Sequence, residues 1–201
     1  TKNKTEELES VKKFWSSKHF KEYLAKVSEE DPNKANKFKI EQAKKMQEIA
    51  RKFLVTSNDF QLEHGTKKVI AQGYLNSDPE RTVRVRISDQ IGYITVKGLG
   101  NKSGITRFEW EKEISLIEAE KLLFICEPGI IQKVRYCIPY GRHTYEVDVF
   151  ERENAGLVIA EVELNSEEEF FKKPLWLGAE VTGIEKYYNG YISNHPYNTW
   201  K

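Results

Sequence analysis

From residue 46 onward, polar and apolar residues alternate with a period of two, the pattern of half-buried β-strands. In the first such segment, Glu48, Ala50 and Lys52 fall on one face, and the apolar positions fall mostly on the other. Seven segments alternate in this way: residues 48–53, 82–87, 93–97, 107–113, 133–138, 145–149 and 160–164. The pattern predicts an α+β domain that is mainly β.

Two capping boxes predict helices between these strands. Ser115 precedes Glu118 by three residues, ahead of a helix expected over 119–126, and Ser166 precedes Glu169 in the same way, ahead of one over 170–172. Gly, Asn, Ser, Asp and Pro cluster near 76–79 and 98–104, where we expect turns.

Residues 1–45 form a different block, so we place a domain boundary there and expect a helical extension before a domain over 46–201. Apolar residues such as Leu8, Val11 and Trp15 recur at helical spacing, and Asp31-Pro32 ends one helix and starts another. The block carries twelve lysines, no arginine and eight acidic residues. It is either a hairpin that packs on the main domain or an added segment, and its interleaved acids disfavour a basic recognition arm. Since the chain starts at Thr1, we expect its natural start to lie elsewhere.

Composition excludes several classes of protein. The formal net charge is +1 over 201 residues, so we do not expect a polybasic nucleic-acid binder. No apolar run is long enough to span a bilayer, so we expect no membrane partner. No signal-peptide pattern opens the chain, and Cys126 and Cys137 form no CxxC. Two free thiols are favoured over a disulfide, and a cytoplasmic protein is expected.

The polar faces of the strands consist almost entirely of Arg, Lys, Glu and Asp. They are either the solvated faces of a sheet or the inner faces of a closed barrel whose apolar faces point outward. In the second case the interior would be a wet ligand site, because unpaired buried charges are costly. Its cations would suit a polyanion, and its carboxylates would suit Mg²⁺ or Mn²⁺. The cations are Lys52, Arg84, Arg86, Lys97, Arg107, Lys133, Arg135 and Lys186.

The chain resembles the CYTH family, the triphosphate tunnel metalloenzymes, and most closely its compact bacterial members. The segment EIARK at 48–52 resembles the family's ExExK opening. The likeness continues in order through GYL at 73–75, ERTVRVRI at 80–87, GYITVKG at 92–98, RFEWEKEI at 107–114, KVRY at 133–136, YEVDVF at 145–150, GLVIAEVEL at 156–164 and VTG at 181–183. The resemblance implies a closed eight-stranded antiparallel tunnel barrel with flanking helices.

Residue roles follow from the same resemblance. The eight cations named above would cradle the phosphates, and Glu48 and Lys52 of the ExExK segment would be catalytic. Two Mg²⁺ or Mn²⁺ ions would be held by Glu48, Asp148, Glu161 and Glu163, while Glu109, Glu111 and Glu146 would support the cations. The simpler alternative for each residue is a salt bridge inside the tunnel. His64 and His143 have no partner at catalytic spacing and are expected at the surface.

One position departs from the family pattern, because Ala50 stands where the second Glu of ExExK belongs. An inactivated variant is favoured over a natural member that has lost hydrolysis, and either would be impaired. The resemblance implies metal-dependent hydrolysis of inorganic or nucleoside triphosphates, with a triphosphate-containing small molecule as ligand and a homodimer as a possible assembly. The alternatives are a class IV adenylate cyclase and a non-catalytic polyphosphate-binding module. The sequence has no P-loop motif.

Overall fold

The computed structural model describes residues 47–101, 103 and 105–200. The helical extension predicted over 1–45 lies outside them. The strands are β1 (Gln47–Val55), β2 (Thr66–Asn76), β3 (Arg81–Ser88), β4 (Ile91–Gly100), β5 (Thr106–Ile114), β6 (Ile131–Tyr140), β7 (His143–Phe150), β8 (Val158–Glu163) and β9 (Leu177–Glu180). The helices are α4 (Leu116–Phe124) and α5 (Asn189–Asn194), with 3₁₀ turns η1 (Asn58–Leu62), η2 (Arg152–Asn154), η3 (Glu185–Tyr187) and η4 (Tyr197–Thr199).

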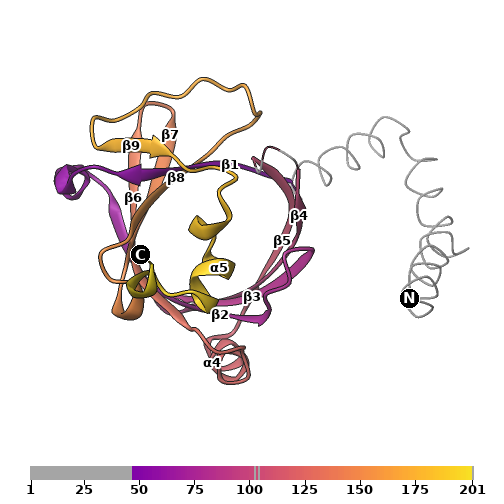
Figure 1. Cartoon of the computed structure of the whole chain (residues 1–201). Helices are drawn as coiled ribbons and strands as arrows, with labels where there is room; N and C mark the ends of the chain where they lie inside the picture. Colours follow the sequence, from indigo (N-terminus) through magenta and orange to yellow (C-terminus); the bar gives the residue numbers. More distant parts are fainter. Residues whose placement is uncertain (1–46, 102, 104, 201) are drawn as a thin grey trace, which may run out of the picture. The chain divides into compact units, whose positions relative to one another are not determined.

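Eight of these strands close into an antiparallel barrel (Figure 1). Their order is β5-β4-β3-β2-β6-β7-β8-β1, and pairing of β1 with β5 completes the ring. The first part of β1 pairs with β5, and its last part pairs with the short strand β9 instead. The closed eight-stranded barrel implied by the resemblance is therefore confirmed.

All seven predicted strand segments are strands, but the alternation missed β2 and β9. In β2, the first four residues are exposed, and the buried run that follows does not alternate. Gly73 lies within this run because a side chain there would collide with Ile130 and Cys126, which pack against the backbone. A four-residue strand such as β9 is too short to show a period.

Only the first capping box forms a helix. The Ser115 hydroxyl accepts a hydrogen bond from the Glu118 amide at 3.2 Å, and the Glu118 carboxylate accepts one from the Ser115 amide at 2.9 Å. The helix predicted at 170–172 is wrong. There the Glu169 carboxylate binds the backbone and side chain of Asn165, and the segment up to Pro174 has no regular secondary structure, with Phe171 buried in the core.

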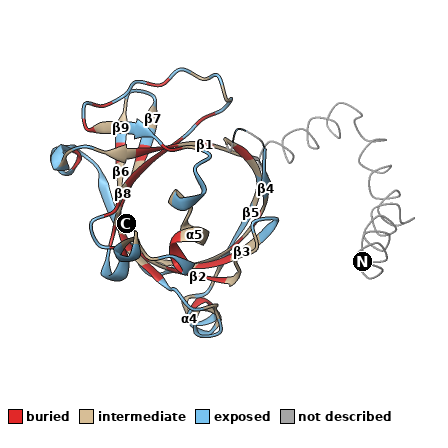
Figure 2. Ribbon diagram, in the orientation of Figure 1, coloured by how far each residue is buried: buried red, intermediate tan, exposed pale blue. Residues whose placement is uncertain are grey.

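The main hydrophobic core lies outside the barrel wall. Outward side chains of β1 and β6–β8, including Phe53, Tyr145 and Val147, pack under Phe60 of η1 and Trp176 ahead of β9. Helix α4 covers another part of the wall, where Gly92 allows close approach of Ala119. Buried residues accordingly line this wall in Figure 2. The charged faces therefore point inward, which decides between the two alternatives posed by the sequence.

Apolar side chains close one end of the interior. Ile131, Phe150 and Ile159 take up the inward positions at that end and pack with Ile192 of α5. The C-terminal segment supplies further cover through Trp200 and its neighbours, and α5 lies across the barrel opening in Figure 1.

No helix in the described part of the chain is long and apolar enough to cross a membrane. Both cysteines are free thiols, as expected.

Candidate active site

The barrel encloses a cavity of about 760 Å³. The residues predicted for the site that line it are Glu48, Lys52, Arg84, Arg86, Lys97, Arg107, Glu109, Glu111, Arg135, Glu146, Glu161 and Glu163. Strand register brings them together from seven separate strands: Glu48 lies opposite Arg107, Lys52 opposite Glu161, and Lys97 opposite Glu109. Opposite charges thus meet across the ladder and make a charged interior possible.

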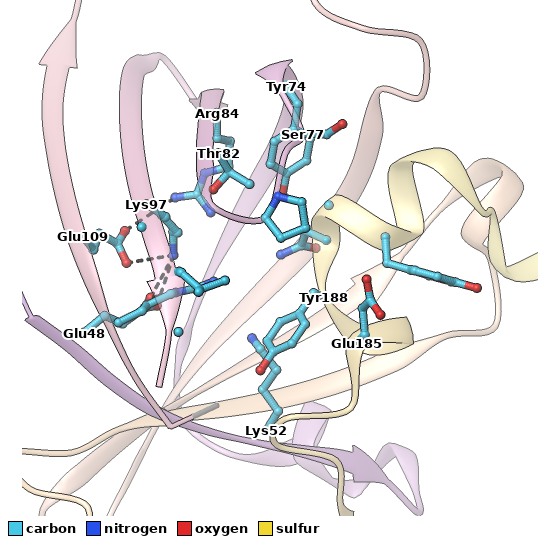
Figure 3. Close-up of a pocket in the computed structure, with 18 of the residues that line it drawn as sticks. Glu48, Lys52, Tyr74, Ser77, Thr82, Arg84, Lys97, Glu109, Glu185 and Tyr188 are labelled. Atoms are coloured by element: carbon cyan, nitrogen blue, oxygen red, sulfur yellow. Dashed lines mark hydrogen bonds and ion pairs between the residues drawn. The ribbon is translucent and has the colours of Figure 1, made fainter. Parts of the chain in front are cut away.

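One group of charges centres on Glu48 and Lys97. The Lys97 ammonium lies 3.0 Å from the Glu48 carboxylate and 2.7 Å from that of Glu109, as Figure 3 shows. Arg107 binds the same Glu48 carboxylate at 2.5 Å. Burial alone would raise the pKa of Glu48, but the charges of Lys97 and Arg107 outweigh it and hold that pKa well below the usual range. Glu48 is therefore an anion held between two cations.

A second group joins β3, β4 and β5. The Arg86 guanidinium lies 2.9 Å from the Glu111 carboxylate, and that of Arg84 lies 3.2 Å from it. The fully buried Thr95 hydroxyl donates to Glu111 at 2.6 Å and accepts from Arg84 at 3.1 Å. Although burial raises the pKa of Glu111, the Arg86 charge and the Thr95 hydroxyl lower it overall. These contacts fix two guanidinium groups side by side at the cavity wall.

A third group links Asp148 to two cations of β6, of which only Arg135 lines the cavity. Both oxygens of Asp148 are engaged, since Arg135 reaches them at 2.7 and 2.8 Å and Lys133 at 2.6 Å. Lys133 is 1% exposed and lies over the Phe150 ring, and neither Lys133 nor Asp148 lines the cavity. Burial lowers the pKa of Lys133 to about 7, while the two cations hold the pKa of Asp148 far below its usual range in spite of burial.

Ala50 is buried and faces inward between Glu48 and Lys52, directly opposite Glu163. Partial burial raises the pKa of Glu163 to about 7, with the negative charges of Glu146 and Glu161 adding to the effect. Carboxylates of this kind fit Mg²⁺ or Mn²⁺ chemically, and a divalent cation would relieve their repulsion. Yet no three His, Cys, Asp or Glu side chains among the described residues are placed to hold a metal. Position 50, between Glu48 and Lys52 on this face, carries a methyl group and no oxygen donor.

The remaining predicted residues lie elsewhere. Lys186 is exposed beside the rings of Tyr187 and Trp200 and does not line the cavity. His64 is exposed as expected. The surface prediction for His143 is wrong, because its side chain is 8% exposed, lies 3.1 Å from the Glu169 carboxylate and packs on an aromatic ring.

Several residues near the cavity carry no clear signal in the sequence. Tyr74 is buried in the cavity wall. Tyr188, which comes from the C-terminal segment, also lines the cavity, and the charged groups of Lys52 and Arg107 each lie 5.9 Å from the centre of its ring (Figure 3). Tyr74 belongs to the GYL segment but to a strand without clear alternation. Tyr188 lies outside any strand, so no periodic signal pointed to it. Thr95 shares the inward face of β4 and could have been identified from its position.

Known proteins resemble this chain in sequence and in fold. The sequence profile of the CYTH domain matches residues 46–190. An inorganic triphosphatase of Acetivibrio thermocellus is 44% identical over 77% of this chain and 97% of its own length, and one of Nitrosomonas europaea is 36% identical over 72% and 95%. The crystal structure of an inorganic triphosphatase, 30% identical, superposes with a TM-score of 0.53 over 73% of this chain and 93% of that one. The barrel, its inward charges and these matches together place the chain in the CYTH family.

Proposed function

We propose that this chain is a metal-dependent triphosphatase that hydrolyses a terminal phosphoryl group from inorganic or nucleoside triphosphates. The observation that carries the proposal is the cavity, in which Arg84, Arg86, Lys97 and Arg107 converge from three neighbouring strands. Arginine forks match phosphate oxygens, and a triphosphate needs several cations to offset its charge. Two relatives that match over most of their length are inorganic triphosphatases.

Phosphoryl transfer needs mainly positioning and charge stabilisation from the protein. The cations of the cavity would bind and align the phosphates, and the carboxylates that now hold those cations would keep them oriented. Glu48, Glu161 and Glu163 do not form a ready-made metal site, so a divalent cation would have to draw their carboxylates together. When bound, Mg²⁺ or Mn²⁺ would supply further charge neutralisation and an activated water. We extend the proposal to two ions. Asp148 already binds two cations through both oxygens, which supports a role in positioning Arg135 and Lys133.

A substrate panel tests the proposed function. Inorganic triphosphate, ATP and thiamine triphosphate are each incubated with Mg²⁺ or Mn²⁺, and the products are identified. Orthophosphate release is the expected result. Cyclic AMP with pyrophosphate would instead identify an adenylate cyclase, and binding without turnover, in this chain and in its Ala50→Glu variant, would identify a polyphosphate-binding module.

Removing either cavity arginine should weaken triphosphate binding. Arg84→Ala or Arg86→Ala is expected to reduce affinity by roughly 10- to 100-fold, because a charge-assisted hydrogen bond contributes about 1.5–3 kcal/mol. Val85 lies between them on the outward face and is fully buried, so Val85→Ala should lower stability and leave affinity nearly unchanged. Calorimetric titration of the three variants measures affinity, and thermal unfolding measures stability. Wild-type affinity in both arginine variants would contradict binding at this wall.

Residues 1–45 should be dispensable for binding. Every residue proposed for the site comes after Met46, and the CYTH match begins at Met46. A chain that begins at Met46 is expected to bind triphosphate within a few-fold of the full chain, as measured by the same titration. Loss of binding in a truncated chain with a folded circular dichroism spectrum would place the extension in the site.

A further inference from the structure

Unpaired polar atoms gather at one place on the barrel's inner face. Among the described residues, five buried side-chain nitrogen or oxygen atoms have no hydrogen-bond partner. Four of them belong to three residues of β2 and β3: both amide atoms of Gln72, and the Nε atoms of Arg84 and Arg86. Buried polar groups are normally paired, so this concentration requires an explanation.

The register of the strands shows why these atoms lack partners. Gln72 is fully buried and lies directly opposite Arg86 on one side and the apolar Ile131 on the other. Arg84 and Arg86 both direct Nη2 to the single carboxylate of Glu111, which leaves each Nε–H without an acceptor. The patch therefore contains more N–H donors than the protein supplies acceptors for.

A phosphoryl group has the complementary chemistry, because it is anionic and its oxygens accept hydrogen bonds. We propose that Gln72 forms a phosphate subsite with Arg84 and Arg86, in which phosphoryl oxygens of a triphosphate accept the N–H groups left unpaired in the free protein. The inference rests on the proposed function and adds Gln72 to the residues that recognise the substrate. An apolar residue at position 72 would avoid the cost of a buried, unpaired amide.

Access to Gln72 comes through the arginines. Arg84 and Arg86 line the cavity, whereas Gln72 lies beside them on the next strand and does not. A triphosphate competes with Glu111 for both guanidinium groups. As they turn from Glu111 toward the ligand, the side chain of Gln72 comes within reach of the same phosphoryl group.

The test compares Gln72→Met with the full-length wild-type chain, because Met has a similar length and no amide. Tripolyphosphate is titrated calorimetrically without added divalent metal, and the melting temperature of the free proteins is measured. We expect affinity to fall by at least about 10-fold, as for a lost hydrogen bond to a charged group, with an equal or higher melting temperature. The control is Gln132→Met on β6, where the amide binds Arg152 outside the main cavity, and its affinity should match that of wild type.

Each result has a distinct meaning. Wild-type affinity in Gln72→Met would overturn the subsite while leaving the proposed function intact. Failure of the wild-type chain to bind tripolyphosphate, with or without Mg²⁺, would overturn both. A crystal structure of the wild-type chain soaked in tripolyphosphate provides a second test that does not depend on a variant's folding. A phosphoryl oxygen within hydrogen-bond distance of Gln72 Nε2 is expected, and a bound ligand that does not reach Gln72 would refute the proposal.

Discussion

Ala50→Glu should increase turnover of inorganic triphosphate by at least about 10- to 100-fold, the scale reported even for residues that only support metal ligands. Ala50 faces the barrel interior, beside Glu48 on the same strand face and opposite Glu163 on β8. A carboxylate there would join Glu48 and Glu163 and complete a set of hard oxygen donors. The gain should appear only with Mg²⁺ or Mn²⁺, and initial rates at saturating metal measure it.

The matched control is Ala155→Glu, which adds the same charge at an exposed position away from the cavity. It should leave turnover unchanged. Because Ala50 is 8% exposed, the melting temperature of Ala50→Glu must be compared with that of the wild-type chain to confirm folding. Equal rates in the folded variant and the wild-type chain would remove position 50 from the mechanism.

Most of the barrel wall was predictable because the inward faces of seven strands carry charges that an apolar core cannot accept. Arg84 and Arg86 on one strand, and Glu109 and Glu111 on another, alternate regularly with apolar residues, and the structure places both pairs at the cavity. Alternation alone could not say whether these faces were inside. That answer depends on the apolar outer face, which is covered by segments distant in sequence.

Other features depend on tertiary contacts that a local pattern does not encode. The Ser166–Glu169 box satisfies the capping rule, but Phe171 packs into the core and the segment forms a loop instead of a helix. Lys186 shares its sign with the cavity cations, yet stacking on aromatic rings holds it outside. The sequence did not identify Gln72 as a candidate site residue, because a single glutamine is informative only once its neighbours and its unpaired amide are known.

Asp148→Asn should lower the free energy of unfolding by about 3–5 kcal/mol, the cost of removing one partner from a buried ion pair. The variant keeps the shape of the side chain but removes the charge that compensates Lys133 and Arg135, both of which are buried. Urea denaturation at pH 8 measures the loss. The control is Asp59→Asn on η1, an exposed carboxylate whose replacement should change stability by less than about 0.5 kcal/mol.

The loss should also depend on pH. Burial already lowers the pKa of Lys133 to about 7, and without the Asp148 charge that pKa should fall further. A folded state that binds a proton less readily than the unfolded chain loses stability as pH falls, until the folded pKa is passed. In the wild-type chain this loss of stability stops near pH 7, whereas in Asp148→Asn it continues below pH 7. The difference between the two proteins should therefore widen from pH 8 to pH 5.5. A variant as stable as the wild-type chain at both pH values, but inactive, would instead identify Asp148 as a metal or substrate ligand without a role in the fold.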